Sequence, residues 1–268
     1  MNEAELLFSE LLGLNRMRLY ERRSLQLGRK KGEAASSVLK RRIAGEPLQY
    51  ILGKSEFMGL EFKITPDVLI PRPETEILVE AALRVIGQCC RKKIRVLDIG
   101  TGSGCIAVSL VKFLPSITVD AVDISAQALS VARENAFLNK TKVNFIKSDL
   151  FSCAALKNAK YDAIITNPPY IASPEIRNLQ IEVQYEPLIA LNGAEDGLDF
   201  YRRISRDAAA HLLKDGMLVM EMGFGQKEAI KNILHKAGCF EIIEVIKDYN
   251  NIDRVLIARK VEKWINYQ

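Results

Sequence analysis

A short glycine-rich segment follows a stretch of apolar residues that has the composition of a buried strand. Asp98 precedes the segment Gly100–Gly104, which gives the spacing Asp-x-Gly-x-Gly-x-Gly. Glycine at alternate positions permits a tight turn and lets a ligand approach the backbone without meeting a Cβ atom. A helix that begins at Cys105 would add the unpaired N–H groups of its first turn. The segment therefore predicts a ligand-binding loop at the end of a strand.

The acid before this loop distinguishes between two kinds of ligand. A loop that holds a pyrophosphate at a helix N-terminus has the spacing Gly-x-Gly-x-x-Gly, which is not the spacing found here. The Asp98 carboxylate would repel a pyrophosphate, but it suits the ammonium group of a methionine moiety. The sequence therefore favours S-adenosylmethionine over NAD, with a nucleotide-binding fold for another ligand as the alternative.

Two further acids follow the next two strand candidates. Asp123 could accept hydrogen bonds from both ribose hydroxyls, as an acid does at that strand end in nucleotide-binding sheets. Asp149 could receive the adenine amino group, with Leu150 or Phe151 against the ring. An aspartate at a strand end can instead cap a helix, but three acids beside one glycine loop favour a cofactor site.

The segment Asn167–Tyr170, with the sequence Asn-Pro-Pro-Tyr, follows a fourth strand candidate. Two prolines cannot continue a strand, so a strand terminator is the purely structural interpretation. The side-chain oxygen of Asn167 and the carbonyl of Pro168 are also two rigid acceptors, and together they could bind both hydrogens of an –NH2 group. Tyr170 offers an aromatic face for stacking, so the segment predicts a site for a planar nitrogen.

Methylation of an amide or aryl amine requires such a site. The nitrogen lone pair is delocalised, so two acceptors would stabilise the positive charge that grows on nitrogen and aim the lone pair at the sulfonium methyl carbon. A strong general base is not needed before attack, in agreement with the absence of a His or Cys candidate near the motif. We therefore predict a methyltransferase in which Asn167, Pro168, Pro169 and Tyr170 are the catalytic residues.

Strand and helix candidates alternate through the part of the chain that contains these motifs, after a long helix for which Thr75 is the candidate N-cap. Short connections and alternation are typical of a parallel, doubly wound sheet. The last two strands are joined only by Asp248–Asn251, so they should pair antiparallel at one edge. The expected fold class is α/β, a Rossmann-like seven-stranded doubly wound sheet with an antiparallel last strand. The strand candidates are Arg95–Ile99, Thr118–Asp123, Val143–Lys147, Tyr161–Thr166, Met217–Met222, Ile242–Lys247 and Arg254–Ala258.

The chain divides into three predicted parts. Residues 1–48 carry apolar residues at helical spacing and predict a small helical domain. Residues 49–72 change to short aromatic and β-branched stretches, Tyr50–Gly53 and Leu60–Ile64, which predict a β-hairpin connector. Residues 73–268 would form the methyltransferase domain.

Residues 171–200 follow the Asn-Pro-Pro-Tyr motif and show few regular features. A loop of this length inside a compact domain is usually functional. We expect part of it to close over the bound substrate, with solvated surface as the alternative.

Composition limits the class of protein. Hydrophobic residues make up 48% and charged residues 26%, as in ordinary globular proteins. No run of about 18 apolar residues predicts a membrane span, and the first ten residues contain three glutamates and no basic segment, which argues against a signal peptide. The five cysteines lack Cys-x-x-Cys spacing. We expect a cytoplasmic monomer that binds no metal.

The net charge of +5 is concentrated near the N-terminus. Between Arg16 and Arg42 there are ten Lys and Arg residues against two Glu, whereas residues 43–268 carry no net charge. A solvated helix face is one explanation, and a docking surface for an acidic partner or RNA is the other.

The glycine loop together with Asn167–Tyr170 resembles the amino-methyltransferases of adenine N6 in DNA, guanine N2 in rRNA and glutamine N5 in proteins. Three further segments resemble the HemK-type release factor glutamine methyltransferases: Gly45–Gly53, Leu69–Glu76 and Tyr185–Leu198. The similarity extends from about residue 40 to the C-terminus. Within it, Pro-Arg-Pro-Glu-Thr at residues 71–75 is the most discriminating part.

This resemblance implies that the substrate is the glutamine of the Gly-Gly-Gln motif in class 1 peptide chain release factors, methylated on its side-chain amide N5 with S-adenosyl-L-homocysteine as the other product. The helical domain would bind the release factor, and its basic stretch would suit an acidic face of that partner. Relatives often carry a large aromatic residue where Leu150 stands, a contact that Phe151 could supply. By position, the cofactor contacts would be Gly100, Thr101, Gly102, Ser103, Gly104, Asp123, Leu150 and Asn167, and the substrate contacts Asn167, Pro168, Pro169 and Tyr170.

The alternatives are a ribosomal protein glutamine methyltransferase, an rRNA or DNA amino-methyltransferase, and a regulator that binds the cofactor without catalysis. A duplex-DNA enzyme must flip its base and usually carries spread basic charge, which residues 43–268 lack. The charge distribution argues less strongly against an enzyme that acts on RNA. A regulator would not need the complete acceptor motif. We therefore expect a protein substrate rather than a nucleic acid.

Overall fold

The computed structural model describes residues 3–21, 26–89 and 91–262. Arg22 and Arg23 of the basic stretch lie outside these residues.

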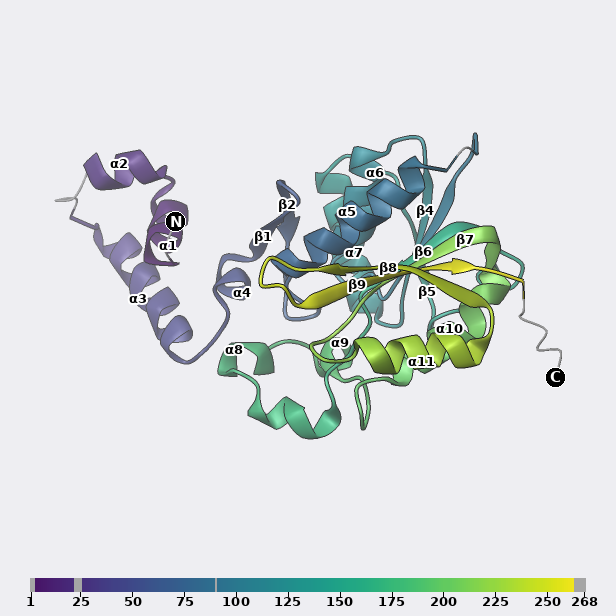
Figure 1. Ribbon diagram of the computed structural model, residues 1–268. Coiled ribbons are helices and arrows are strands. Elements are labelled where there is room, and N and C mark those ends of the chain that lie inside the picture. The colour runs from purple at the N-terminus through teal and green to yellow at the C-terminus, as the bar shows by residue number, and fades with distance from the viewer. Residues whose placement is uncertain (1–2, 22–25, 90, 263–268) are drawn as a thin grey trace.

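A seven-stranded sheet forms the centre of the molecule, in the order β5-β4-β3-β6-β7-β9-β8 (Figure 1). Its strands are β3 (Arg95–Ile99), β4 (Thr118–Asp123), β5 (Asn144–Lys147), β6 (Tyr161–Thr166), β7 (Leu212–Glu221), β8 (Phe240–Lys247) and β9 (Asp253–Lys260). The last strand, β9, runs antiparallel to β7 and β8, whereas the other neighbouring pairs are parallel. The expected α/β fold class, with its antiparallel last strand, is confirmed.

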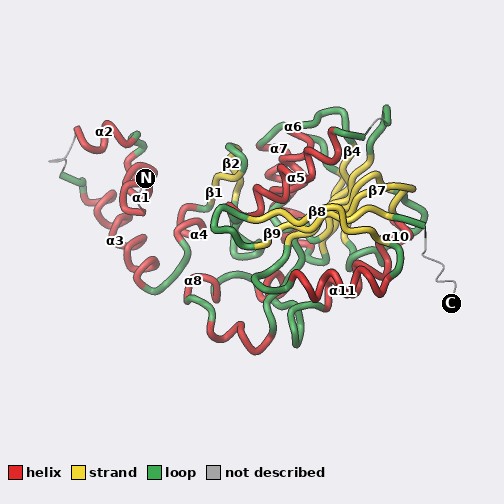
Figure 2. The backbone as a smooth tube through the Cα atoms, viewed as in Figure 1, coloured by secondary structure: helices red, strands yellow, loops and turns green. Residues whose placement is uncertain are grey.

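Helices cover both faces of the sheet (Figure 2). One face packs against α5 (Pro73–Gly87), α6 (Cys105–Phe113) and α7 (Ala126–Leu138), and the other against α10 (Asp199–His211) and α11 (Lys227–Ala237). Because both faces are covered, all six residues of β6 are buried, as in the central strands of other parallel sheets. The rigid layers hold the ends of the strands, and therefore the loops that follow them, in fixed relative positions.

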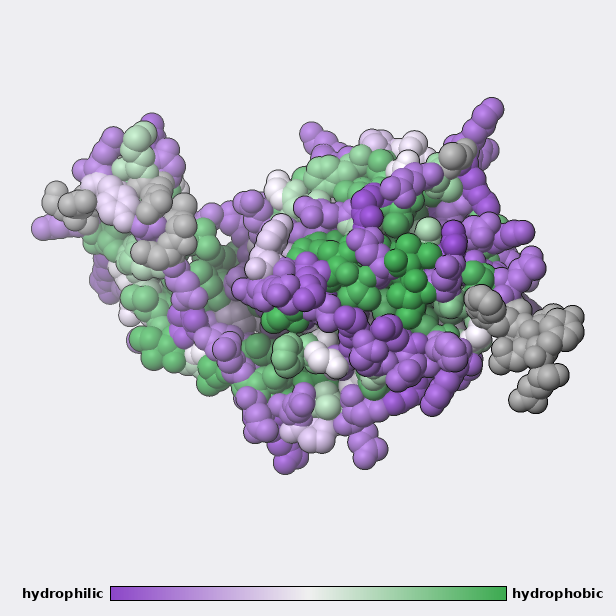
Figure 3. All heavy atoms as spheres, viewed as in Figure 1, coloured by the Kyte–Doolittle hydropathy of each residue, from purple (hydrophilic) through white to green (hydrophobic). Residues whose placement is uncertain are grey.

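The N-terminal part is helical, as the apolar spacing predicts. Its helices are α1 (Glu3–Leu12), α2 (Arg16–Glu21), α3 (Arg29–Ile43) and α4 (Leu48–Leu52). The first three lie apart from the sheet, and α4 lies between them and the hairpin (Figure 1). The space-filling view shows these helices projecting from the rest of the molecule, with apolar side chains visible near the junction (Figure 3).

The hairpin connector is present, but the prediction for its first arm is wrong. Tyr50–Gly53 was expected to be extended, yet it forms the end of α4, which Gly53 terminates with a φ of 72°. A left-handed residue ends a helix readily and cannot continue a strand. The strands are β1 (Lys54–Phe57) and β2 (Leu60–Lys63). Met58 and Gly59 join them with φ values of 53° and 69°, the positive φ that suits a two-residue hairpin turn.

Short helical turns make up about half of residues 171–200. They are η2 (Ser173–Asn178), α8 (Ile181–Gln184) and α9 (Leu188–Leu191), and a further turn, η1 (Ala154–Leu156), precedes β6. Figure 1 shows α8 on the side of the molecule that faces the N-terminal helices.

Candidate active site

The glycine loop and the Asn-Pro-Pro-Tyr motif follow adjacent strands. β3 and β6 are parallel neighbours with Ile99 opposite Thr166, so the segments after them emerge side by side at one edge of the sheet. The chain order reverses between these two strands, and open α/β sheets bind ligands at such a reversal. The structure thus brings together the two motifs that the sequence predicts to act together.

The glycine loop has a backbone that other residues rarely adopt. Gly100, Gly102 and Gly104 have φ values of 71°, 53° and 80°, in the left-handed region that favours glycine. A Cβ atom on Gly104 would also lie 3.0 Å from the Cβ of Ala132. Both backbone conformation and close packing against α7 therefore require glycine at residue 104.

Asp123 holds the glycine loop in place. One carboxylate oxygen accepts a hydrogen bond from the N–H of Gly102 at 2.9 Å, and the other from the N–H of Ser125 at 2.9 Å. Burial raises the pKa of Asp123, and these N–H bonds act in the opposite direction. The helix N-cap is Ser125, which accepts from the N–H of Ala128, so capping does not account for Asp123. Each oxygen keeps a second lone pair that can accept a hydrogen bond from a hydroxyl group.

Asp98 is completely buried beneath the loop. Its Oδ2 atom accepts a hydrogen bond from the Thr101 hydroxyl at 2.6 Å, whereas Oδ1 has no partner among the described residues. Burial, with a smaller contribution from the charge of Asp123, raises the pKa of Asp98 to about 7. The charge of Asp98 beneath the loop favours a cationic group on the other side of it, such as the ammonium group of a methionine moiety. The site therefore fits the methionine end of S-adenosylmethionine.

One pocket beside the loop contains most of the residues predicted to contact the cofactor. Asp98, Thr101, Ser103 and Gly104 are instead buried and support the loop from within. The predicted residues that line the pocket are Gly100, Gly102, Asp123, Asp149, Leu150, Asn167 and Pro169.

The far end of this pocket differs in part from the prediction. Leu150 lines it, but Phe151 does not and is stacked on the ring of His211 at 4.6 Å, so the expectation that Phe151 covers an adenine ring is wrong. Phe200 of α10 lines the pocket instead. It lies 49 residues after Phe151 in the chain, and no local pattern marks it. The Asp149 carboxylate accepts from Arg203 at 2.7 Å, so an adenine amino group would share this acid with a guanidinium.

The side-chain amide of Asn167 has a defined orientation. Its Nδ2 atom donates to the Thr75 hydroxyl at 3.1 Å, so its oxygen points away from Thr75. The expectation that Thr75 caps α5 is wrong, because the helix begins at Pro73 with Arg72 as the N-cap residue. Proline suits the first helical position. Thr75 therefore falls inside the first turn and is 3% exposed.

Glu221 at the end of β7 is a site residue that the sequence does not reveal. It is 1% exposed, and its carboxylate accepts hydrogen bonds from the hydroxyls of Thr75 at 2.8 Å and Tyr170 at 3.5 Å. Burial raises the pKa of Glu221 to about 7, against the opposing effects of the Thr75 hydrogen bond and the Arg254 charge. The single available signal was an acid inside the apolar stretch Leu218–Met222.

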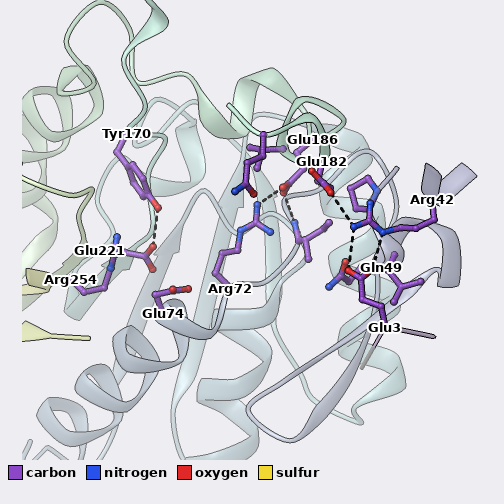
Figure 4. Close-up of a pocket in the computed structure, with 15 residues that line it drawn as sticks. Glu3, Arg42, Gln49, Arg72, Glu74, Tyr170, Glu182, Glu186, Glu221 and Arg254 are labelled. Atoms are coloured by element: carbon purple, nitrogen blue, oxygen red, sulfur yellow. Dashed lines mark hydrogen bonds and ion pairs between the residues drawn. The ribbon is translucent and has the colours of Figure 1, made fainter. Parts of the chain in front are cut away.

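A second cavity lies on the side of Tyr170 that faces the N-terminal helices. Figure 4 shows Tyr170, Glu221 and Arg254 at one end of it, and Arg42 with Glu182 at the other. Its walls come from the N-terminal helices, from the start of α5 and from α8. The cavity therefore joins the acceptor motif to the helical part of the chain.

Residues 171–200 hold this cavity together through charged contacts (Figure 4). Glu186 forms an ion pair with Arg72 and accepts from the N–H of Ile70 at 3.0 Å. Arg42 binds Glu3 at 3.1 Å and Glu182 at 3.0 Å. The segment is therefore part of the wall of the site and links α8 to the N-terminal helices.

Among the described residues, no group of three or more His, Cys, Asp or Glu side chains is arranged to hold a metal ion. In the same part of the chain, every helix is too short or too polar to cross a membrane.

Known proteins resemble this chain along nearly its whole length. Residues 75–182 match the family model of the methyltransferase small domain, and residues 1–53 match that of the PrmC N-terminal domain. The chain is 41% identical over 262 residues to the release factor glutamine methyltransferase of Thermodesulfovibrio yellowstonii, covering 97% of this chain and 92% of the relative. It is 43% identical over 261 residues to the enzyme of the same name from Geobacter sulfurreducens, covering 96% and 88%.

Solved structures share the fold at lower sequence identity. A methyltransferase from Pyrococcus furiosus has a TM-score of 0.55 at 18% identity, covering 86% of this chain and 99% of that one. The hMettl16 catalytic domain has a TM-score of 0.63 at 18% identity, covering 90% and 83%. With relatives of about 40% identity over nearly the full length, the chain belongs to the release factor glutamine methyltransferase family.

Proposed function

We propose that this enzyme transfers a methyl group from S-adenosylmethionine to the side-chain amide N5 of the glutamine in the Gly-Gly-Gln motif of class 1 peptide chain release factors. The observation that carries the proposal is the orientation of Asn167. Its amide donates to Thr75 at 3.1 Å, which leaves the oxygen to accept from a substrate –NH2 group. The relatives named release factor glutamine methyltransferase support the substrate.

The residues of the glycine loop fit the cofactor. The negative charge of Asp98 beneath the loop would attract the ammonium group. Asp123 would bind the ribose hydroxyls and Asp149 the adenine amino group, with Leu150 against the ring. S-adenosylmethionine supplies a methyl group made electrophilic by its positively charged sulfur. No metal is needed in this scheme, because the charge that develops at nitrogen is positive and is stabilised by acceptors.

The acceptor motif would act by binding and orientation. Asn167 Oδ1 and the Pro168 carbonyl would each accept one N–H of the glutamine amide, while Tyr170 packs against the plane of the amide. Both acceptors strengthen their hydrogen bonds as the nitrogen becomes positive, which lowers the barrier selectively. After transfer the cationic nitrogen is strongly acidic and loses a proton to water in the open cavity.

Mass spectrometry of the Gly-Gly-Gln peptide tests the proposal. Purified release factor is incubated with the enzyme and S-adenosylmethionine, and ribosomal protein and total rRNA are incubated in parallel. The expected result is the mass of one methyl group added to the glutamine of the release factor and to neither of the other substrates. Methylation of rRNA or ribosomal protein with an unmodified release factor would refute the proposed substrate.

We also propose that the basic N-terminal stretch docks an acidic face of the release factor. Arg41 and Arg42 are paired within the protein, with Glu46 and with Glu3 and Glu182. Lys30 and Lys31 of α3 are exposed.

Charge reversal tests this docking surface. Exchanging Lys30, Lys31, Arg22 and Arg23 for glutamate is expected to raise the KM for release factor by about 10-fold and to steepen its dependence on salt, with kcat nearly unchanged, because charges at the rim of an interface act mainly on association. Reversal of Lys92, Lys93, Lys140 and Lys142, four exposed residues outside the N-terminal helices, is the matched control. Equal KM values for the two variants would show that the basic stretch is only a solvated helix face.

The proposal also covers the oligomeric state and location of the enzyme, its division into domains and the role of residues 171–200. The enzyme would act as a monomer in the cytoplasm. Residues 1–48 would be the substrate-binding domain, 49–72 the connector and 73–268 the methyltransferase domain. Residues 171–200 would close over the bound glutamine loop, in keeping with their contacts to both parts of the chain.

A further inference from the structure

Three side chains connect the acceptor motif to a buried acid on a distant element. The Thr75 hydroxyl lies between Asn167 Nδ2, at 3.1 Å, and Glu221 Oε2, at 2.8 Å. The three residues come from the segment after β6, from α5 and from β7. Thr75 is 3% and Glu221 1% exposed, so water does not compete strongly for these hydrogen bonds.

The direction of each hydrogen bond follows from the carboxylate. An ionised glutamate can only accept, so the Thr75 hydroxyl must donate its single proton to Glu221. The Thr75 oxygen is then left as an acceptor, and it selects the –NH2 end of the Asn167 amide. The oxygen of that amide consequently points away from Thr75. The negative charge of Glu221 therefore acts through two hydrogen bonds to favour one orientation of the Asn167 amide.

This orientation matters because the two ends of an asparagine amide have nearly the same shape. Packing alone does not distinguish them, and only hydrogen-bond partners do. A flipped Asn167 would present two N–H donors to the –NH2 group of the substrate, which also donates. The acceptor that stabilises the developing positive charge would then be lost.

We propose that Thr75 and Glu221 are positioning residues for methyl transfer, which together fix the Asn167 amide with its oxygen toward the substrate nitrogen. The inference rests on the proposed function, since it assigns how the acceptor motif of that reaction is oriented. It also gives a role to the threonine of Pro-Arg-Pro-Glu-Thr, which contacts Glu221 across 146 residues of chain.

The same carboxylate contacts the other end of the motif. Its Oε1 atom accepts from the Tyr170 hydroxyl at 3.5 Å, a long and therefore weak hydrogen bond. The Tyr201 hydroxyl donates to the backbone carbonyl of Glu221 at 2.9 Å rather than to its carboxylate. Glu221 thus contacts both ends of the motif, Asn167 through the Thr75 hydroxyl and Tyr170 directly.

The protonation state of Glu221 should control this arrangement. Burial and the negative charge of Glu74 on α5 raise the pKa of Glu221 to about 7, while hydrogen bonds from Thr75 and Tyr170 and the positive charge of Arg254 on β9 oppose the rise. Above this pH the carboxylate accepts from Thr75. Below it a protonated Glu221 can donate to Thr75, and the chain can reverse so that Thr75 donates to the oxygen of Asn167. Turnover should therefore fall as the pH decreases through about 7.

The first experiment compares three variants by steady-state kinetics, with the cofactor concentration varied up to saturation. Thr75→Val removes the hydroxyl and keeps the shape, and we expect kcat to fall by about 10- to 100-fold, as misoriented catalytic groups do, with the KM for cofactor within about threefold of wild type. Thr75→Ser should recover most of the turnover. Thr166→Val is the matched control. It removes a buried hydroxyl from the residue before Asn167, and that hydroxyl donates to the Ile99 carbonyl at 2.9 Å rather than to the acceptor motif.

A kcat for Thr75→Val no lower than that of Thr166→Val would overturn the inference, as would failure of Thr75→Ser to recover turnover. Wild-type enzyme that leaves release factor unmethylated would instead count against the proposed function. The two failures are therefore separable within one set of assays.

The second experiment does not depend on the stability of the Thr75 variants. The pH profile of kcat is measured for wild type and for Glu221→Gln between pH 5.5 and 9 (roughly the range that brackets a pKa near 7). We expect a decline on the acidic side in wild type and its loss, with a lower plateau, in Glu221→Gln. Saturating cofactor separates this effect from Asp98, whose pKa is also raised to about 7 and which would act on cofactor affinity. An identical acidic limb in both proteins would overturn the inference.

Discussion

Replacing Asn167 by alanine is expected to lower kcat for methyl transfer by about 1,000-fold, the upper range for removal of one preorganised group that stabilises transition-state charge. The amide oxygen would no longer accept from the substrate nitrogen. The loss should appear in kcat more than in KM, because the acceptor binds most strongly once the nitrogen has become positive. Cofactor affinity should stay within a few-fold of wild type, since Asn167 is only one of many residues that line the cofactor pocket.

Single-turnover rates and calorimetric titration of S-adenosylmethionine measure the two quantities separately. Asn144→Ala is a suitable control, because it removes an amide that donates to Asp120 at 2.9 Å on a neighbouring strand, away from the acceptor motif. Undiminished turnover in Asn167→Ala would contradict the mechanism. Loss of cofactor binding to the same extent as turnover would show that Asn167 acts chiefly on the cofactor.

Replacing Asp123 by alanine is expected to weaken cofactor binding by about 100- to 1,000-fold, which corresponds to the loss of two hydrogen bonds to a charged group at about 2 kcal/mol each. A second effect adds to the first. The N–H of Gly102, which donates to Asp123 at 2.9 Å, would lose its partner, so the glycine loop would no longer be held in its binding conformation. Asp123→Asn keeps one acceptor and should lie between the two.

The Kd for S-adenosylmethionine, measured by calorimetry with circular dichroism to verify folding, tests this expectation. Asp207→Ala provides the control, because it removes an aspartate that is paired with its neighbour Arg206 at 2.8 Å on α10. A Kd for Asp123→Ala equal to that of the control would exclude a role for Asp123 in binding the ribose.

The sheet was predictable because its strands are marked locally. β3, β4 and β6 have the predicted bounds, since each is an apolar run that ends at a polar residue or at a glycine loop. β7 begins at Leu212, five residues before the prediction, because it accommodates Asp215 at a φ of 59° and a register shift against β6. Asp215 and Gly216 lie within this register shift and have no partner on β6, so their local preference for a turn is kept as an irregularity inside the strand.

The parts of the site that were missed depend on contacts distant in sequence. Phe151 was a reasonable candidate by position, but the next turn of chain directs it toward His211. Thr75 looked like a helix cap because caps are recognised within four residues. Its actual partner, Glu221, is 146 residues away. The cofactor loop consists of consecutive residues, so the sequence predicts it. Thr75 and Glu221, which hold Asn167, come together only when the sheet has formed.

Different residues line the two cavities that meet at the Asn-Pro-Pro-Tyr motif. Asn167 and Pro169 line the cavity beside the glycine loop, and Tyr170 lines the one that faces the N-terminal helices. The two walls are nevertheless continuous, because Leu69 and Pro187 line the first cavity and their chain neighbours Ile70 and Glu186 line the second. A protein acceptor bound against Ile70 and Glu186 would therefore reach the wall of the donor cavity through single peptide bonds. Occupancy of one cavity can thus alter the affinity of the other for its ligand.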